Sequence, residues 1–141
     1  MEYHYAVSGE DFSLAGNASS EMKKTLKRLG LPPEIIKKTA VAMYEAEMNM
    51  VVHAGGGDAH ISIENNCITI IMRDTGPGIA DIDLAMQDGY STAPEKVQQL
   101  GFGAGMGLPN MKRNSDELVI DSTPGEGTTV TMKIHIPEAQ E

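Results

Sequence analysis

A long segment bounded by proline and glycine constrains the fold of this chain more than any other feature. Pro32-Pro33 opens the segment and Gly55-Gly56-Gly57 closes it, the order in which these residues begin and end helices. Its apolar residues share one stripe, which comprises Ile35, Ala42, Met43, Ala46 and Met50. The spacing predicts a helix from Pro33 to about Ala54 whose apolar side packs on a sheet.

Several segments have residue patterns that predict the strands of this sheet. Alternation over His60–Glu64, the pair Asn65-Asn66 and the apolar run Cys67–Met72 predict a β-hairpin. The other expected elements are a strand at Tyr3–Val7, helices at Asn17–Leu29, Ile79–Met86 and Pro109–Asn114, and strands at Leu118–Ile120 and Thr128–Ile136. The polar stretch 87–100 is long for a connection, which is typical of a lid beside a binding site. Together, the predicted helices and strands indicate a single sheet covered by a layer of helices.

Length and composition predict a single globular domain over residues 1–141, with 40% hydrophobic residues. The net charge of -9 argues against nucleic acid or an anionic membrane as the main partner and favours a basic protein partner. Cys67 is the only cysteine, so it forms no internal disulfide, and we expect it to be a small buried hydrophobic residue. No run reaches the ~20 apolar residues of a membrane span, so we expect a cytoplasmic protein.

An acid and an amide on the long helix indicate a ligand site. Glu45 and Asn49 are four residues apart and lie on the same side of a helix, where they can address one ligand together. The amide oxygen of Asn49 is a suitable ligand for Mg²⁺, and Glu45 could accept a proton or remain a solvated carboxylate. Glu47 is rotated roughly 160° from that line, so we expect it to face solvent. His53 continues the line, where it would interact with the helix dipole.

Two glycine-rich segments follow along the chain. Asp74 ends a predicted strand and precedes Gly76 and Gly78, so its carboxylate could accept an exocyclic amine such as that of adenine. The same pattern could be merely a turn after a strand. Gly103, Gly105 and Gly107 alternate just before a helix, which predicts a phosphate seat, although such glycines also occur in surface loops. The chain contains neither G-x-x-x-x-G-K-[ST] nor G-x-G-x-x-G in this loop.

These segments, together with Gly127-Thr128-Thr129, resemble the four boxes of the GHKL ATPases in order and spacing. Within that superfamily the chain is most similar to the small bacterial switch kinases of the anti-sigma factor group, especially the stressosome-type members. Ala42–Ala54, Arg73–Ile79 and Gly101–Met111 supply this match. The resemblance implies an α+β fold, a two-layer α/β sandwich of the Bergerat type with helices on one face of a mixed sheet.

The resemblance also implies an activity. The protein would bind ATP with Mg²⁺ and phosphorylate a serine or threonine of an anti-sigma antagonist of the STAS type, with Glu45 as general base and Asn49 as metal ligand. The implied nucleotide-binding residues are Asn49, Asp74, Gly76, Gly78, Gly103, Gly105, Met106, Gly107, Leu108 and Thr128. Other implied partners are a sigma factor and a second copy of the chain.

The segment between Gly89 and Gly101 bears on the transfer step. Lys96 is its only cation, whereas switch kinases tend to place an arginine there against the terminal phosphate; Lys112 or Arg113 could substitute. The alternative function is therefore a nucleotide-gated binding module that sequesters a sigma factor or activates a phosphatase.

Overall fold

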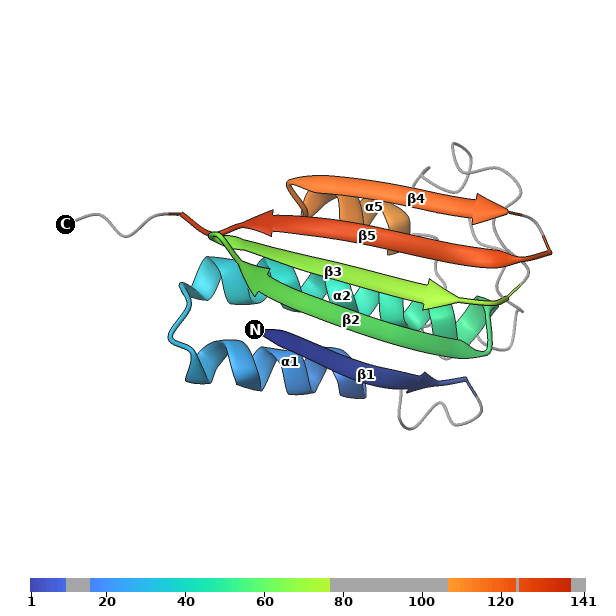
Figure 1. Ribbon diagram of the computed structural model, residues 1–141, viewed down its shortest axis with the longest axis horizontal. Coiled ribbons are helices and arrows are strands. Elements are labelled where there is room, and N and C mark those ends of the chain that lie inside the picture. The colour runs from blue at the N-terminus through green and yellow to red at the C-terminus, as the bar shows by residue number, and fades with distance from the viewer. Residues whose placement is uncertain (10–15, 77–106, 124, 138–141) are drawn as a thin grey trace.

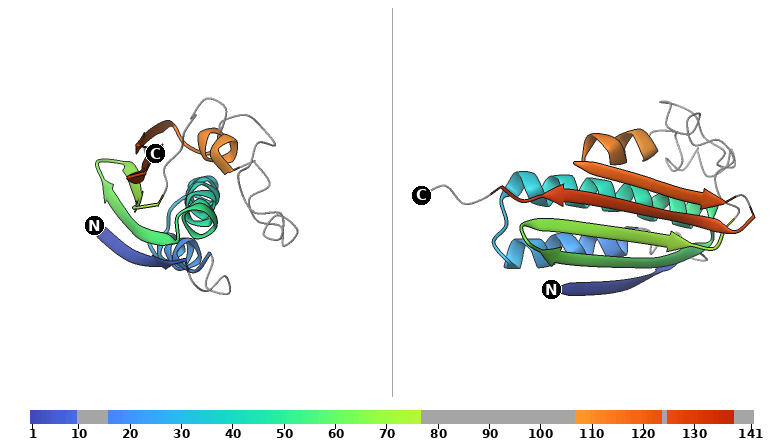
Figure 2. Two further views of the ribbon diagram at one scale, coloured as in Figure 1. Left: turned by 90° about the vertical axis from the view of Figure 1, so that its right-hand side faces the viewer. Right: turned by 45° about the horizontal axis from the view of Figure 1, so that its top comes forward.

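The computed structural model describes residues 1–9, 16–76, 107–123 and 125–137. Within these ranges five strands form one sheet and three helices cover one of its faces (Figures 1 and 2). The elements are β1 (Glu2–Ser8), α1 (Asn17–Arg28), α2 (Pro33–His53), β2 (Gly56–Glu64), β3 (Cys67–Asp74), α5 (Gly107–Arg113), β4 (Glu117–Thr123) and β5 (Gly127–His135). The expected two-layer α+β architecture is confirmed.

The helix α2 matches its prediction closely. It begins with proline in the first turn and ends at His53, two residues before Gly55, whose φ of 74° is left-handed. The preceding helix α1 ends in the same way, with Gly30 at φ 74° donating its N–H to Lys27 O. This tight reversal sets α1 and α2 antiparallel and side by side (Figure 2).

The sheet has the order β1-β2-β3-β5-β4, and each pairing between these described strands is antiparallel. The expected mixed sheet is thus an antiparallel one in this part of the chain. Asn65 and Asn66, with φ of 52° and 59°, make the two-residue turn between β2 and β3. The hairpin prediction is therefore confirmed, because consecutive left-handed residues match the twist of the two strands.

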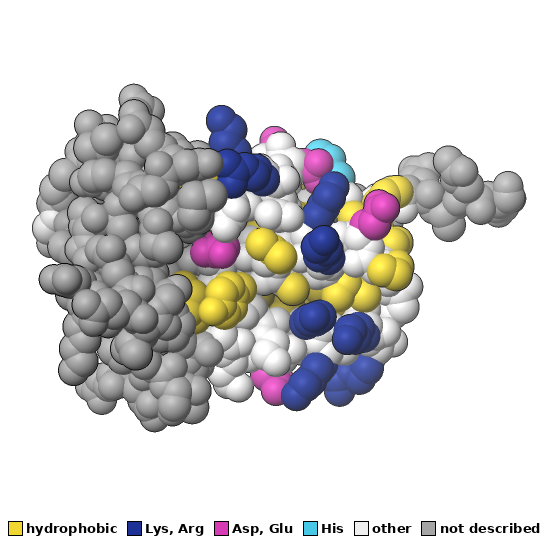
Figure 3. Space-filling view, turned by 180° about the vertical axis from the view of Figure 1, so that it is seen from behind, with side chains coloured by type: hydrophobic (Ala, Val, Ile, Leu, Met, Phe, Trp, Pro, Cys, Tyr) yellow, Lys and Arg dark blue, Asp and Glu magenta, His cyan; other side chains and the backbone are white. Residues whose placement is uncertain are grey.

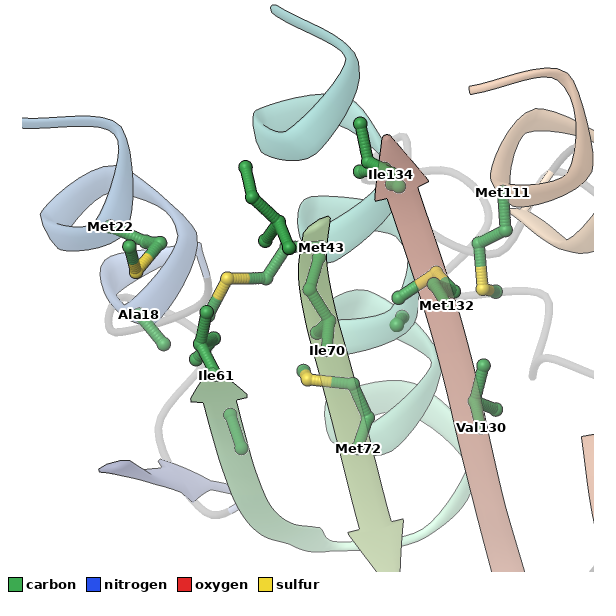
Figure 4. Close-up of a cluster of buried hydrophobic side chains, with 14 of the residues drawn as sticks. Ala18, Met22, Met43, Ile61, Ile70, Met72, Met111, Val130, Met132 and Ile134 are labelled. Carbon is green, nitrogen blue, oxygen red and sulfur yellow. The ribbon is translucent and has the colours of Figure 1, made fainter. Parts of the chain in front are cut away.

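Alternation along the strands separates a core face from an outer face. Ile70 and Met72 of β3 point toward the helices (Figure 4), and both are buried, as is Ile68 two residues earlier. Methionine fills much of this core, through Met22, Met43, Met48, Met50, Met72, Met111 and Met132. Cys67 belongs to the outer face and is only half-buried, so the expectation of a buried cysteine is wrong. The period of two decides this, since Cys67 is one residue out of phase with Ile68.

No helix among the described residues is long and apolar enough to cross a membrane. The helix expected at Ile79–Met86 and the lid expected over 87–100 lie outside the described residues.

Candidate nucleotide site

Four of the predicted site positions lie at or near the ends of their elements. Asp74 is the last residue of β3, Thr128 is the second of β5, Gly107 is the first of α5, and Asn49 lies near the end of α2. Figure 1 shows the end of β3, the start of β5 and the end of α2 on the right of the molecule, while α5 lies nearer the middle. The antiparallel pairing places the end of β3 beside the start of β5, with Asp74 opposite Thr128.

Backbone donors fix the carboxylate of Asp74 at this end. Its Oδ1 accepts N–H bonds from Gly76 at 3.0 Å and from Thr128 at 3.2 Å, while the side chain remains half-buried. Among the described residues no donor contacts the second oxygen, Oδ2. One oxygen therefore orients the carboxylate and the other is left to accept a hydrogen bond from a ligand.

Two glycines of the predicted loops are required by close backbone approach. A Cβ on Gly76 would lie 2.6 Å from Ala54 at the end of α2, and a Cβ on Gly127, at φ 128°, would lie 2.2 Å from the carbonyl oxygen of Asp74. These glycines pack the end of β3 against its neighbours. The hydroxyl of Thr128 lies 2.9 Å from that of Ser122 on β4.

Glu45 and Asn49 lie on one side of α2, as expected, and both are half-buried. The Glu45 Oε1 accepts a 3.2 Å hydrogen bond from the side-chain amide of Asn110 on α5. The amide of Asn49 has no hydrogen-bond partner among the described residues. An unpaired amide on a half-buried surface fits a site whose partner is a ligand or a metal ion.

Asn110 was not predicted as a site residue. Its partner Glu45 is 65 positions away in sequence, so no local pattern joins the two. The only hint was its place three residues after Gly107, in the helix that follows the predicted phosphate seat.

The prediction that Glu47 faces solvent is wrong. Its side chain is 1% exposed, and its carboxylate accepts N–H bonds from Gly16 and Ala18 at 3.1 Å and from Ser19 at 2.9 Å. The side of α2 opposite Glu45 is covered by α1 and not by water. A sequence signal existed, because Glu47 lies four residues after Met43 and three before Met50 and so falls within the apolar stripe.

Several predicted positions cannot be placed. Gly78, Gly103, Gly105, Met106 and Lys96 lie outside the described residues. Leu108 is the second residue of α5 and His53 is the last residue of α2. Arg113, suggested from sequence as a substitute cation, is exposed and donates from Nη1 to Asn110 Oδ1 at 3.1 Å.

Charge is unevenly distributed over the surface. Eight of the eleven Lys and Arg residues lie in the three described helices, namely Lys23, Lys24, Lys27, Arg28, Lys37, Lys38, Lys112 and Arg113. The same helices contain four glutamates, and one of these, Glu47, is buried. Figure 3 shows the basic side chains spread over the helical face. The net charge of -9 therefore does not describe this face.

The family model for histidine kinase-, DNA gyrase B- and HSP90-like ATPases matches residues 36–140. This range contains each nucleotide-site position described above, from Glu45 to Thr128. The chain belongs to this ATPase family. The resemblance to the GHKL ATPases found in the sequence is thus confirmed, and so is the assignment of the fold to them.

Several curated proteins are similar to this chain over most of their length. An anti-sigma F factor of Geobacillus thermodenitrificans is 35% identical over 109 residues, which cover 73% of this chain and 70% of the relative. The serine/threonine-protein kinase RsbT of Bacillus subtilis is 35% identical over 114 residues, covering 77% and 78%. An anti-sigma F factor of Caldanaerobacter subterraneus is 40% identical over 104 residues, covering 70% and 68%.

Solved structures support the fold alone. A structure of the RsbU and RsbW domains of a Mycobacterium tuberculosis protein aligns with a TM-score of 0.66 and 15% identity, covering 96% of this chain but 32% of that longer one. The mycobacterial sensor histidine kinase MprB aligns with a TM-score of 0.56 and 15% identity, covering 96% and 98%.

Proposed function

We propose that this ATPase-family domain binds ATP with Mg²⁺ and phosphorylates a serine or threonine of an anti-sigma antagonist protein. Two kinds of relative support this assignment, the anti-sigma F factors and the serine/threonine-protein kinase RsbT, each at about 35% identity over more than two thirds of the chain. The observation that carries the proposal is the half-buried pair Glu45 and Asn49, four residues apart on α2.

Each residue of the pair has a distinct role in this proposal. Asn49 would hold Mg²⁺ through its amide oxygen, with ATP phosphates and water completing the octahedron. Bound Mg²⁺ would neutralise charge on the transferring phosphate. Glu45 would accept the proton of the attacking hydroxyl, and its Oε2, which has no donor among the described residues, is the oxygen available for this step.

The remaining predicted residues would hold the nucleotide. Asp74 Oδ2 would accept a hydrogen bond from the adenine amino group, with Gly76, Gly78 and Thr128 around the ring. Backbone N–H groups of Gly103, Gly105, Met106, Gly107 and Leu108 would surround the phosphates, at the start of α5.

A transfer assay tests the proposed activity directly. The protein is incubated with γ-labelled ATP, Mg²⁺ and purified candidate antagonists encoded beside its gene. We expect label on a serine or threonine of one candidate, and no label when Mg²⁺ is removed with a chelator. Tight ATP binding without transfer to any candidate would contradict the kinase assignment.

Replacing Asp74 with asparagine tests the adenine contact. An asparagine that keeps its oxygen toward the N–H groups of Gly76 and Thr128 must turn its NH₂ group toward the adenine amine, so that two donors face each other. We expect Asp74→Asn to abolish the rise in Tm that ATP gives the wild type.

The control for this variant is Asp121→Asn, which changes an exposed aspartate on β4. Thermal denaturation with and without ATP should give the control the same nucleotide-dependent rise as the wild type. An unchanged rise in Asp74→Asn would refute the adenine assignment, whatever the stability of the free variant.

The same relatives support a proposal for the cellular setting. We propose a cytoplasmic protein that acts as a homodimer on a STAS-type antagonist, a sigma factor or both, with no direct contact to nucleic acid or membrane. The basic partner inferred from net charge does not suit the helical face, where cations outnumber acids. An antagonist that docks on this face would therefore present an acidic surface.

A nucleotide-gated binding module is the second candidate function. The observation that favours it is the single cation, Lys96, between Gly89 and Gly101. In this case ATP occupancy alone would set the conformation that binds a sigma factor or activates a phosphatase. The transfer assay separates the two functions, because the module would bind ATP and a partner without labelling it.

A further inference from the structure

The side chain of Asn110 connects the two helices of the candidate site. From α5, its Nδ2 donates to Glu45 Oε1 on α2 at 3.2 Å, in a half-buried contact. On its other side Oδ1 accepts from Nη1 of Arg113 at 3.1 Å. Both ends of the amide are therefore engaged.

Chemistry allows only one orientation of this amide. An ionised Glu45 carboxylate can only accept hydrogen bonds, and the guanidinium of Arg113 can only donate them. A flipped amide would place oxygen against oxygen at Glu45 and NH₂ against N–H at Arg113. Arg113 thus fixes the donor of Asn110 toward Glu45.

The backbone of Asn110 is also held in place. Its neighbours Pro109 and Met111 are buried, and Met111 belongs to the core between the layers. The side-chain amide of Asn114 donates to the carbonyl oxygen of Asn110 at 2.8 Å. An anchored backbone and an oriented amide together leave Asn110 little freedom.

We propose that Asn110 is a positioning residue that holds the Glu45 carboxylate for proton transfer. The inference rests on the proposed kinase function. Asn110 occupies Oε1 and so turns Oε2 toward the hydroxyl of the protein substrate. Because α5 begins at Gly107, three residues before Asn110, the same contact ties the general base to the end of the predicted phosphate loop.

Removing the amide should slow phosphoryl transfer more than it weakens nucleotide binding. A catalytic group displaced by about 1 Å can lose about 10²-fold in rate. We expect Asn110→Ala to lower kcat by about 10- to 100-fold, with the KM for ATP within about twofold of the wild type. Asn110→Asp should be at least as slow, because it sets a second carboxylate against Glu45.

Two further variants complete the kinetic test. Glu34→Ala is the control, because it removes an exposed side chain from α2 eleven residues before Glu45. Its kcat should stay near that of the wild type. Asn110→Gln keeps an amide on a longer side chain and should restore part of the rate lost in Asn110→Ala. Equal kcat for Asn110→Ala and the wild type would overturn the proposal.

A second measurement detects the contact without any transfer reaction. The side-chain NH₂ signals of Asn110 are identified in a ¹H–¹⁵N spectrum by their absence in Asn110→Ala. We expect them to shift in Glu45→Ala and to stay in place in Glu34→Ala, which removes an exposed glutamate from the same helix. Signals that do not respond to Glu45→Ala would overturn the contact itself.

The two measurements separate failure of this inference from failure of the proposed function. If the wild type labels no candidate antagonist, the positioning role falls together with the kinase assignment. A retained shift of the Asn110 signals would then show that the reaction was wrong and the contact correct. If the wild type transfers phosphate and only Asn110→Ala is slow, both proposals are supported.

Discussion

Replacing Glu47 with alanine is expected to lower the free energy of unfolding by about 2–4 kcal/mol. The carboxylate is 1% exposed and accepts three backbone N–H bonds at the start of α1. The N-cap residue Gly16 has no side chain, so no local group can replace Glu47. Alanine would leave those N–H groups without partners and remove a negative charge from the positive end of the α1 dipole.

Urea denaturation of the purified protein measures this loss. The matched control is Glu34→Ala, an exposed glutamate in the first turn of the same helix, which should change the free energy of unfolding by no more than about 0.5 kcal/mol. Glu47→Gln should fall between the two, because glutamine keeps one acceptor but turns NH₂ toward a backbone donor. A Glu47→Ala variant as stable as Glu34→Ala would show that α1 is capped in another way.

Replacing Glu45 with glutamine is expected to reduce phosphoryl transfer by about 10²- to 10⁴-fold. Glutamine keeps an oxygen that can accept the hydrogen bond from Asn110, so the junction between α2 and α5 is preserved. It cannot take a proton from the substrate hydroxyl. Glu45→Ala removes both the base and the contact, and label transfer should disappear in it as well.

The measurement combines transfer of label with ATP-dependent thermal stabilisation. Both Glu45 variants should retain the rise in Tm with ATP, because Asn49 and Asp74 are unchanged. The control Glu34→Ala should transfer label at the wild-type rate. Transfer at the wild-type rate in Glu45→Gln would exclude Glu45 as the general base and would mean that another group accepts the proton.

Most elements of the fold could be predicted because local signals mark their ends. These signals are proline at the start of α2, left-handed glycines after α1 and α2, and the Asn65-Asn66 turn. Each one acts on the backbone within a few residues of its own position. Direction in the sheet was harder to predict. Whether β3 and β5 pair parallel or antiparallel depends on the path between them, and that pairing is antiparallel.

Some residues of the candidate site could be predicted from the sequence and others could not. The structure brings Asp74, Gly76 and Thr128 together, because Asp74 accepts backbone N–H bonds from the other two. Glu47 was predicted wrongly because helix geometry gives the direction of a side chain but not what lies there. Asn110 was missed because its partner comes from a distant helix.

The sequence by itself determined which described segments are helices and strands, the hairpin turn and the line of Glu45 and Asn49, since each depends on contacts within a few residues. It did not determine every boundary, because β2 begins at Gly56 and not at His60. Only the tertiary structure decided that Glu47 is buried against α1 and that Asn110 reaches Glu45. Both contacts join segments 28 or more residues apart. The physical reason is that burial and pairing between distant segments arise from packing of the two layers, which no single segment encodes.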